Sequence, residues 1–187
     1  MGKIDSVEAL TGAVRAGTPV TYLHFWGHRP QRDGRVGPGC LSQWWPAPFT
    51  VDGVVYATAE HWMMAAKARL FADPEAERLV LAAGHPAEAK KAGLLVKGFD
   101  EETWRRERFR IVVEGSVHKF AAHPDLREFL LGTGERVLVE ASPVDRVWGI
   151  GLAARDEAAS DPARWKGPNL LGFALMEARE RLRSDAG

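Results

Sequence analysis

The spacing of apolar residues predicts a chain built mainly from helices. In the C-terminal segment Leu171, Ala174, Leu175, Ala178 and Leu182 recur at helical intervals and form one apolar stripe. Helix starts are indicated at Thr58, at Asp73 before Pro74, at His85 before Pro86, at Asp100 and at Pro124. The segment that follows Asp100 predicts one longer helix, which ends before Pro124. The fold class expected from this pattern is mainly α.

Strand signals are few and short. Phe49–Val51 and Val54–Tyr56 flank an Asp-Gly pair, which tolerates the positive φ angles of a type I′ turn, so the sequence predicts a small β-hairpin. Residues 21–26 and 136–140 are two further strand candidates. The segment 27–39 is rich in glycine, proline and arginine and predicts a loop.

Length and composition favour one domain. A chain of 187 residues with 45% hydrophobic residues is long enough for one well-formed core. We expect residues 1–20 to form an N-terminal helical extension, in which Asp5 caps a helix that ends near Gly17. Residues 21–183 are expected to form the domain, and residues 184–187 a frayed tail.

The charge balance excludes some classes of partner. Lys and Arg number 25, as do Asp and Glu, so no net charge favours binding to duplex DNA in general or to an anionic membrane. No apolar stretch approaches 18 residues and no signal peptide is evident, which predicts a soluble, cytoplasmic protein. The single cysteine, Cys40, has no internal disulfide partner and is expected to be a packing residue.

The segment 58–68 is the most informative part of the chain. Glu60, Met64 and Lys67 fall on one side of the predicted helix, so a carboxylate and an amine share an otherwise apolar face. Two interpretations are open. The charges are either a solvated decoration of a core helix, or they line a pocket with Trp62 beside it.

A second candidate region is the loop 141–151. It carries Asp145, Arg146 and Trp148 among glycines and a proline, and a loop of this kind can present functional groups. Surface charges with a tryptophan that fills the core are an equally good interpretation. The six histidines show no metal-ligand spacing, and Gly149-Ile150-Gly151 lacks the rest of a dinucleotide fingerprint, so neither a metal nor a cofactor is expected.

Several motifs together resemble one known family. They comprise residues 41–49, 56–68, 98–100 with Trp104, 119–120, 131–134, 140–151 and 165–172. Their order resembles that of the NADAR, or YbiA-like, family from about Phe25 to Leu182, with a departure at Gln43, where the family more often has asparagine. The resemblance implies a mainly helical YbiA-like fold and hydrolysis of N-glycosidic bonds to ribose that carries phosphate.

The resemblance implies two alternative substrates. One is the early ribosylaminopyrimidine 5′-phosphate intermediates of riboflavin synthesis, whose removal would be damage control. The other is ADP-ribose attached to guanine bases of nucleic acid. The partner is therefore a small ribose-phosphate heterocycle or an ADP-ribosylated guanine. A non-catalytic ADP-ribose-binding module is the alternative from another class.

The residues suit cleavage of an N-glycoside. A carboxylate stabilises an oxocarbenium-like state or activates water, and by resemblance Glu60 and Asp145 are the two carboxylates, joined by Trp104. Two roles are open for Lys67. It is either a point charge that holds phosphate or an amine that attacks an opened ribose aldehyde. The remaining candidates for substrate binding are Trp62, Trp104 and Trp148 as stacking surfaces, Arg146 and Lys119 as phosphate contacts, and Asn169, which either caps the C-terminal helix or binds a ribose hydroxyl.

Overall fold

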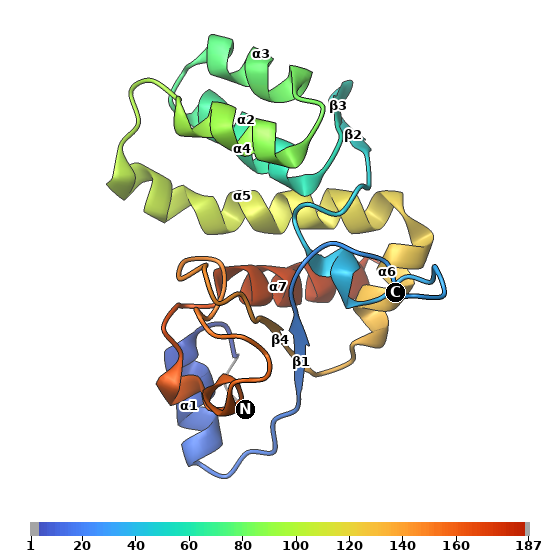
Figure 1. Ribbon diagram of the computed structural model, residues 1–187, viewed down its shortest axis with the longest axis vertical. Coiled ribbons are helices and arrows are strands. Elements are labelled where there is room, and N and C mark those ends of the chain that lie inside the picture. The colour runs from blue at the N-terminus through green and yellow to red at the C-terminus, as the bar shows by residue number, and fades with distance from the viewer. Residues whose placement is uncertain (1–3, 186–187) are drawn as a thin grey trace. The chain divides into compact units, whose positions relative to one another are not determined.

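The fold is mainly α, as the sequence predicts (Figure 1). The computed structural model describes residues 4–185. Contacts group these residues into two compact units. Unit 1 contains the described residues up to Ser42 and those from Asp125 onward, and unit 2 is Gln43–Pro124. The middle of the chain therefore forms one unit, while segments from both ends of the chain together form the other.

Unit 2 contains a hairpin and four helices, all at predicted positions. These elements are β2 (Phe49–Val51), β3 (Val54–Tyr56), α2 (Ala59–Leu70), α3 (Pro74–Ala82), α4 (Pro86–Leu94) and α5 (Glu101–Ala122). The two strands pair antiparallel, with Phe49 opposite Tyr56. Asp52 and Gly53 both have positive φ angles, of 50° and 78°, so the predicted hairpin is confirmed.

The predicted helix caps of unit 2 are confirmed. The side chain of Thr58 accepts a hydrogen bond from the backbone N–H of His61, that of Asp73 from Ala76, and that of Asp100 from Thr103. Each bond satisfies one of the N–H groups that a helix leaves open in its first turn. These three local signals fix where α2, α3 and α5 begin.

Gly115 does not interrupt α5, although glycine weakens a helix. A Cβ atom at this position would overlap the ring of Trp62. The indole Nε1 of Trp62 also donates to the carbonyl of Ile111, at 2.8 Å. Glycine is therefore needed here because it lets α2 and α5 approach each other closely.

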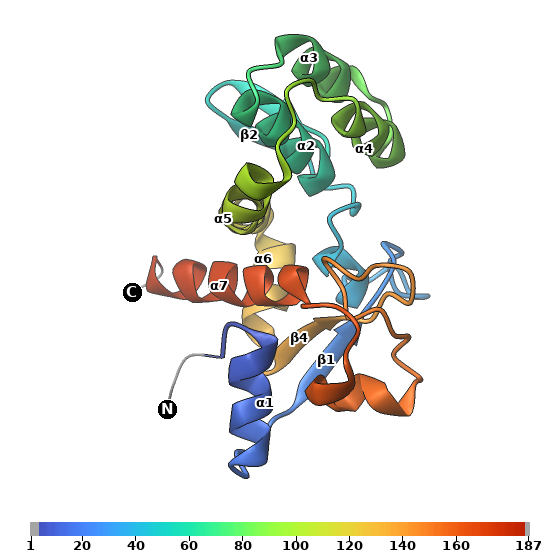
Figure 2. The ribbon, with the colours of Figure 1, turned by 90° about the vertical axis from the view of Figure 1, so that its left-hand side faces the viewer.

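Helix α2 is the central element of unit 2, with α3, α4 and α5 packed around it (Figure 2). Burial extends over its whole circumference, from Ala59 to Met64 and on to Ala65, Lys67 and Ala68. Glu60 is 4% exposed and Lys67 8% exposed. The interpretation of these two charges as a solvated decoration is therefore wrong.

Unit 1 combines a two-stranded sheet with helices from both ends of the chain. Its elements are α1 (Val7–Arg15), β1 (Tyr22–Phe25), η1 (Pro38–Leu41), α6 (Pro124–Gly132, whose first residue closes unit 2), β4 (Val137–Glu140), η2 (Glu157–Ser160), η3 (Pro162–Arg164) and α7 (Leu170–Ser184). Strands β1 and β4 pair in parallel, from Tyr22 opposite Val137 to Phe25 opposite Glu140, and α7 packs against β4. Both strands are confirmed, but their pairing was not predicted.

The two ends of unit 1 differ in detail from the prediction. Ser6, not Asp5, caps α1, because its hydroxyl accepts from the N–H of Ala9 at 3.1 Å, so the prediction of Asp5 as the cap is wrong. The helix does end before Gly17, which has a φ of 78°. Of the tail predicted to fray, Ser184 lies in the last turn of α7, and residues 186–187 lie outside the described residues.

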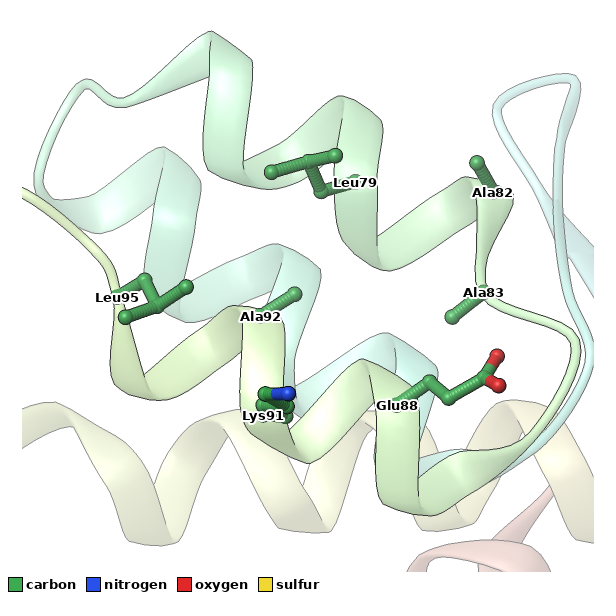
Figure 3. A pocket seen from close by; sticks show the side chains of 7 residues that line it. All are labelled: Leu79, Ala82, Ala83, Glu88, Lys91, Ala92 and Leu95. Carbon is green, nitrogen blue, oxygen red and sulfur yellow. The ribbon is translucent and has the colours of Figure 1, made fainter.

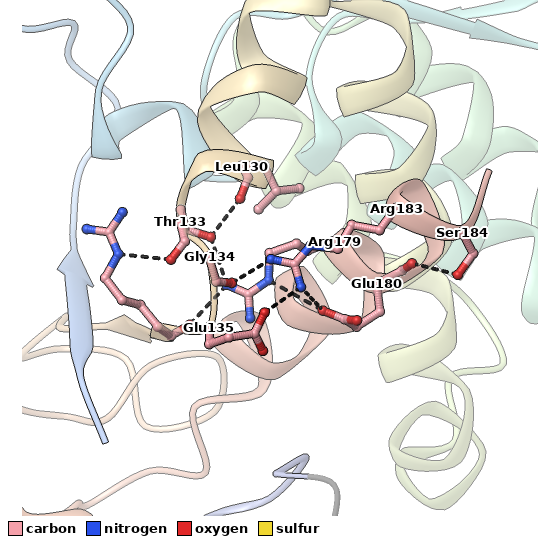
Figure 4. Close-up of polar contacts among 9 residues, drawn as sticks. Leu130, Thr133, Gly134, Glu135, Arg179, Glu180, Arg183 and Ser184 are labelled. Atoms are coloured by element: carbon pink, nitrogen blue, oxygen red, sulfur yellow. Dashed lines mark hydrogen bonds and ion pairs between the residues drawn. The ribbon is translucent and has the colours of Figure 1, made fainter. Parts of the chain in front are cut away.

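A buried arginine joins α7 to the turn between α6 and β4 (Figure 4). The Nη1 atom of Arg179 donates to the hydroxyl of Thr133 at 2.7 Å and to the carbonyl of Arg136 at 3.0 Å. Arg183 donates to the carbonyl of Gly134 at 2.8 Å. Burial lowers the pKa of Arg179, and the hydroxyl of Thr133 and the carbonyl of Arg136 both bind its Nη1 atom. Thr133 and Gly134, in the motif at residues 131–134, thus accept hydrogen bonds from side chains of α7.

Candidate active site

Glu60 lies in the first turn of α2, where a helix favours negative charge. Thr58 caps this helix, and the backbone N–H of Glu60 donates to the carbonyl of Gln43 at 3.0 Å. The open N–H groups at a helix N-terminus carry partial positive charge and stabilise a carboxylate there. The burial of Glu60 would otherwise disfavour its ionised form. The sequence thus places a carboxylate inside unit 2 at a position that tolerates it.

The neighbouring His61 is a structural residue. Its Nε2 lies 3.1 Å from the carbonyl of Ala83, and its Nδ1 lies 2.8 Å from the hydroxyl of Thr58. A carbonyl only accepts hydrogen bonds, so Nε2 carries the proton and Nδ1 accepts from Thr58. Burial lowers the pKa of His61, which keeps the ring neutral. The neutral ring joins the start of α2 to the end of α3.

Lys67 lies two turns beyond Glu60 on the same side of α2, about 10 Å further along the helix axis. Its Nζ atom donates to the carbonyl of Gly93 at 2.9 Å. The same atom is 4.3 Å from the ring centroid of Phe99 and 5.6 Å from that of Trp104. The structure therefore brings Lys67 and Trp104 together, as a site built on both residues requires.

Opposing effects act on the protonation of Lys67. Burial lowers its pKa, while the negative charge of Glu101 acts in the opposite direction. The carbonyl end of α4 and the faces of the two aromatic rings also favour an ammonium group. The net result is a pKa below the ordinary value for lysine, so this amine loses its proton more easily than an exposed one.

The approach of α4 to Lys67 depends on Gly93. A Cβ atom at this position would overlap the sulfur of Met64 on α2. Because glycine has no Cβ, α4 packs closely on α2, and the carbonyl of Gly93 reaches the amine. The hydrogen-bond partner of Lys67 is thus fixed by helix packing.

Phe99 belongs to the surroundings of Lys67, although it is not among the site residues predicted from the sequence. It immediately precedes Asp100, the cap of α5, and Trp104 is the fourth residue of that helix. Apolar residues at these two positions form the hydrophobic staple pattern, in which they pack together across the helix start. That pattern was the available signal that Phe99 and Trp104 lie near each other.

Trp62 and Lys119 occupy other parts of unit 2. Trp62 points toward α5, where its hydrogen bond to Ile111 and its contact with Gly115 make it a core residue. Lys119, on α5, is 1% exposed, and its Nζ lies 5.0 Å from the ring centroid of Phe120. The described contacts of Trp62 are structural, and contact of either residue with substrate stays a prediction.

In unit 1 the loop after β4 holds Asp145 by its own backbone. The Oδ1 atom of Asp145 accepts from the N–H groups of Val147 and Trp148, both at 2.8 Å. The carbonyl of Asp145 accepts from Gly151 at 3.0 Å, and that of Trp148 accepts from Leu171 at 3.0 Å. The carboxylate is therefore fixed in a tight turn that leads to the start of α7.

The other predicted residues of unit 1 have different surroundings. Arg146 is exposed and Trp148 is half-buried. Asn169 is fully buried at the start of α7, but its side chain makes no cap hydrogen bond, so the prediction that it caps this helix is wrong. Its Oδ1 accepts from the N–H of Glu140 and its Nδ2 donates to the carbonyl of Leu138. A left-handed backbone (φ 54°) turns the side chain toward β4 instead.

A separate groove lies between α3 and α4 (Figure 3). It has a volume of about 320 Å³ and is lined by Leu79, Ala82, Ala83, Glu88, Lys91, Ala92 and Leu95. None of the residues predicted for N-glycoside chemistry lines it. Within residues 4–185 no group of three or more His, Cys, Asp or Glu side chains is placed to hold a metal ion. In the same part of the chain no helix is long and apolar enough to cross a membrane.

Comparison with known proteins identifies the family. The model of the NADAR domain matches residues 24–183, which include all of unit 2 and most of unit 1. The chain belongs to the NADAR family. The resemblance of its motifs to this family is thereby confirmed.

Several relatives of this NADAR protein are named N-glycosidases. An N-glycosidase of Acanthamoeba polyphaga mimivirus is 38% identical over 164 residues, which cover 85% of this chain and 95% of that protein. An N-glycosidase of Nostoc punctiforme is 34% identical over 146 residues, 78% of this chain and 86% of its own. The N-glycosidase YbiA of Escherichia coli K12 is 30% identical over 144 residues, 77% of this chain and 81% of its own. The predicted enzyme class, N-glycosidase, is confirmed.

The fold agrees with a solved relative. The NMR structure of Escherichia coli YbiA superimposes with a TM-score of 0.71 at 26% identity, and the match covers 89% of this chain and 87% of that one. The predicted YbiA-like fold is therefore confirmed.

Proposed function

We propose that this NADAR protein hydrolyses the N-glycosidic bond of the early ribosylaminopyrimidine 5′-phosphate intermediates of riboflavin synthesis, in the cytoplasm. The observation that carries the proposal is a buried carboxylate and a buried amine on one side of α2, with the ring of Trp104 beside the amine. A protein rarely buries two such groups unless they are used, because each ion loses hydration.

The reaction needs an oxygen nucleophile and stabilisation of positive charge. The bond between the anomeric carbon and the heterocycle nitrogen breaks, a water oxygen bonds to that carbon, and a proton passes to the departing nitrogen. Glu60 is suited to stabilise the oxocarbenium-like transition state or to take a proton from water. We assign Asp145 as the second carboxylate, because of its family motif and because two backbone N–H groups fix its orientation.

Two roles fit the amine of Lys67. As an ammonium it would bind the phosphate of the substrate, and the about 10 Å that separate it from Glu60 along α2 suit groups that address different ends of a ribose phosphate. As a neutral amine, which its lowered pKa favours, it would attack the anomeric carbon of the ring-opened ribose. The heterocycle amine would leave as the lysine imine forms, and water would then hydrolyse the imine to release the ribose phosphate. In the second role the anomeric carbon lies at Lys67, so the heterocycle would meet the ring of Trp104 beside it.

Removal of ADP-ribose from guanine breaks the same kind of bond and is the competing substrate assignment. A binding module without turnover is less well supported, because a buried carboxylate such as Glu60 repels an anionic ligand and has no use in a pure binder. The two enzymatic alternatives differ in substrate, so direct product analysis separates them.

The test is product release by the purified protein from the ribosylaminopyrimidine 5′-phosphate and from guanine-ADP-ribosylated DNA. We expect ribose 5-phosphate from the first substrate and a loss of about 10²–10⁴-fold in Glu60→Gln. Glu102→Gln is the matched control, because Glu102 also lies in a first helical turn but is exposed. Release of ADP-ribose alone would reassign the substrate, and no release from either would support the binding module.

A further inference from the structure

The amine of Lys67 is covered by a side chain that is itself open to solvent. The ring of Phe99 lies 4.3 Å from Nζ, yet Phe99 is 43% exposed, while Lys67 is 8% exposed. One face of this ring therefore contacts the amine, and the residue also reaches the surface. A molecule that approaches Lys67 from this side meets Phe99 first.

The position of Phe99 is held on three sides. The ring of Phe71, at the end of α2, contacts it edge-on with 5.3 Å between the centroids. The backbone N–H of Lys97 donates to the buried carboxylate of Asp73 at 2.8 Å, which ties the segment before Phe99 to the start of α3. Asp100, the next residue, is fixed as the cap of α5. These contacts give the ring a defined place above the amine.

The arrangement gives Lys67 a definite orientation. Its Nζ donates to the carbonyl of Gly93, and the rings of Phe99 and Trp104 occupy two further directions around it. Trp104 is buried in unit 2, whereas Phe99 contacts Phe71 and the amine and remains 43% exposed. An exposed aromatic ring over a buried amine loses the usual benefit of apolar burial on its outer face.

We propose that Phe99 is a positioning residue that covers the Lys67 amine, holds it against the carbonyl of Gly93 and limits which reactants reach it. The proposal depends on the function proposed above only for the assignment of Lys67 to the site. The cover itself is tested by chemical labelling of lysines, which needs no turnover, so its failure is distinguishable from failure of the proposed function.

The experiment treats the folded protein with a small amine-acylating reagent and measures each modified lysine by peptide mass spectrometry. The rate at Lys67 is divided by the rate at Lys90, an exposed lysine of unit 2. We expect a low ratio in the native protein and at least a several-fold higher ratio in Phe99→Ala. Phe99→Tyr, which keeps the ring, should restore the native ratio, and Leu94→Ala, a change at a 71% exposed apolar residue nearby in the chain, should leave it unchanged.

Labelling of Lys119 would show that unit 2 as a whole has loosened, because this lysine of α5 is 1% exposed in the native protein. It should stay unlabelled in Phe99→Ala. If it becomes labelled, the comparison is made with Phe99→Leu, which keeps an apolar side chain without the ring and should again raise the Lys67 ratio. The proposal would be overturned if the ratio of Lys67 to Lys90 labelling stayed native in whichever of Phe99→Ala and Phe99→Leu keeps Lys119 protected. A raised ratio in Phe99→Tyr would also overturn it.

The kinetic consequence is a second readout. If Phe99 orients the amine, Phe99→Ala should lower kcat/KM for the substrate that Lys67 serves, and Phe99→Tyr should restore it. A raised labelling ratio with unchanged kcat/KM in Phe99→Ala would overturn the positioning role. Absence of activity in the native protein, with the labelling pattern as expected, would instead count against the proposed function.

Discussion

Lys67 and Asp145 are both charged residues proposed for the reaction, but they are held in different ways. The carboxylate of Asp145 is fixed by Val147 and Trp148, its near neighbours in the chain. The amine of Lys67 is fixed by Gly93 on α4, by Phe99 in the following segment and by Trp104 on α5. A local turn therefore positions one group, and the packing of several helices positions the other. Changes far from Lys67 in the chain should disturb it, whereas Asp145 should respond mainly to changes in its own loop.

Removal of the amine should produce the largest effect. We expect Lys67→Ala to lower kcat/KM by about 10²–10⁴-fold, because the amine either binds the substrate phosphate or forms the covalent intermediate. A rise in KM would identify a phosphate contact, and a fall in kcat would identify an imine. Borohydride added during turnover would trap an imine as a stable adduct. Lys91→Ala removes an exposed lysine from α4 and should retain native kinetics; native kinetics in Lys67→Ala would exclude Lys67 from the site.

Two changes at Asp145 separate its charge from its place in the turn. Asp145→Asn keeps an oxygen that accepts the two N–H groups, so activity should fall by about 10²–10³-fold while the melting temperature stays near native. Asp145→Ala loses the hydrogen bonds as well and should cost about 1 kcal/mol of unfolding free energy. Kinetic assays and thermal unfolding measure the two effects.

Asp156→Asn is the control for these variants, because Asp156 accepts a backbone N–H in another exposed turn of unit 1. It should retain activity. If Asp145→Asn were equally active, Asp145 would have a structural role only.

A methyl group at Gly115 should test the dependence of unit 2 on helix packing. Gly115→Ala forces α5 away from the ring of Trp62 and should destabilise the protein by about 1–3 kcal/mol, measured by urea unfolding. Gly12→Ala, in a helix where a Cβ meets no atom within 4 Å, should be neutral or stabilising. Equal stability of the two variants would show that the contact between Trp62 and Gly115 does not limit the packing of α2 on α5.

Mild acid should have the smallest effect, and it should act on the end of α2 that carries Glu60. Burial lowers the pKa of His61, so the unfolded chain binds a proton at a higher pH than the folded chain does. The stabilising contribution is complete above the unfolded pKa, about 6.5, and is lost as the pH falls toward the lower folded value. The urea concentration at the unfolding midpoint should decrease as the pH falls through this range. The decrease should be smaller in His61→Gln.

His123→Gln leaves His61 in place and should keep the native pH dependence. An identical decrease in His61→Gln and in the native protein would assign the pH dependence to other groups.

The sequence predicts those features that depend on neighbouring residues. Caps at Thr58, Asp73 and Asp100 and the Asp52-Gly53 hairpin are found where predicted, because a side chain and a nearby N–H, or two backbone conformations, decide each of them. The position of Glu60 and Lys67 on the same side of α2 follows from helical periodicity in the same way. These local rules were sufficient for most of the element boundaries.

Features that depend on distant residues were not predictable in this way. Asparagine is a residue type that often caps helices, yet the side chain of Asn169 binds β4. Only the tertiary arrangement brings that strand within its reach. The parallel pairing of β1 with β4 and the partner of Lys67 on α4 have the same origin. Phe99 was missed because an apolar residue before a helix cap is usually explained by packing alone.

The parallel pairing of β1 with β4 has a consequence for synthesis of the chain on the ribosome. β1 leaves the ribosome early, but its partner strand is translated only after all of unit 2. Unit 2 is one continuous segment and has all its own contacts available by then, whereas β1 keeps an open hydrogen-bonding edge until Val137–Glu140 emerges. A pause in translation between these two strands would therefore prolong the period in which the nascent chain is prone to aggregation.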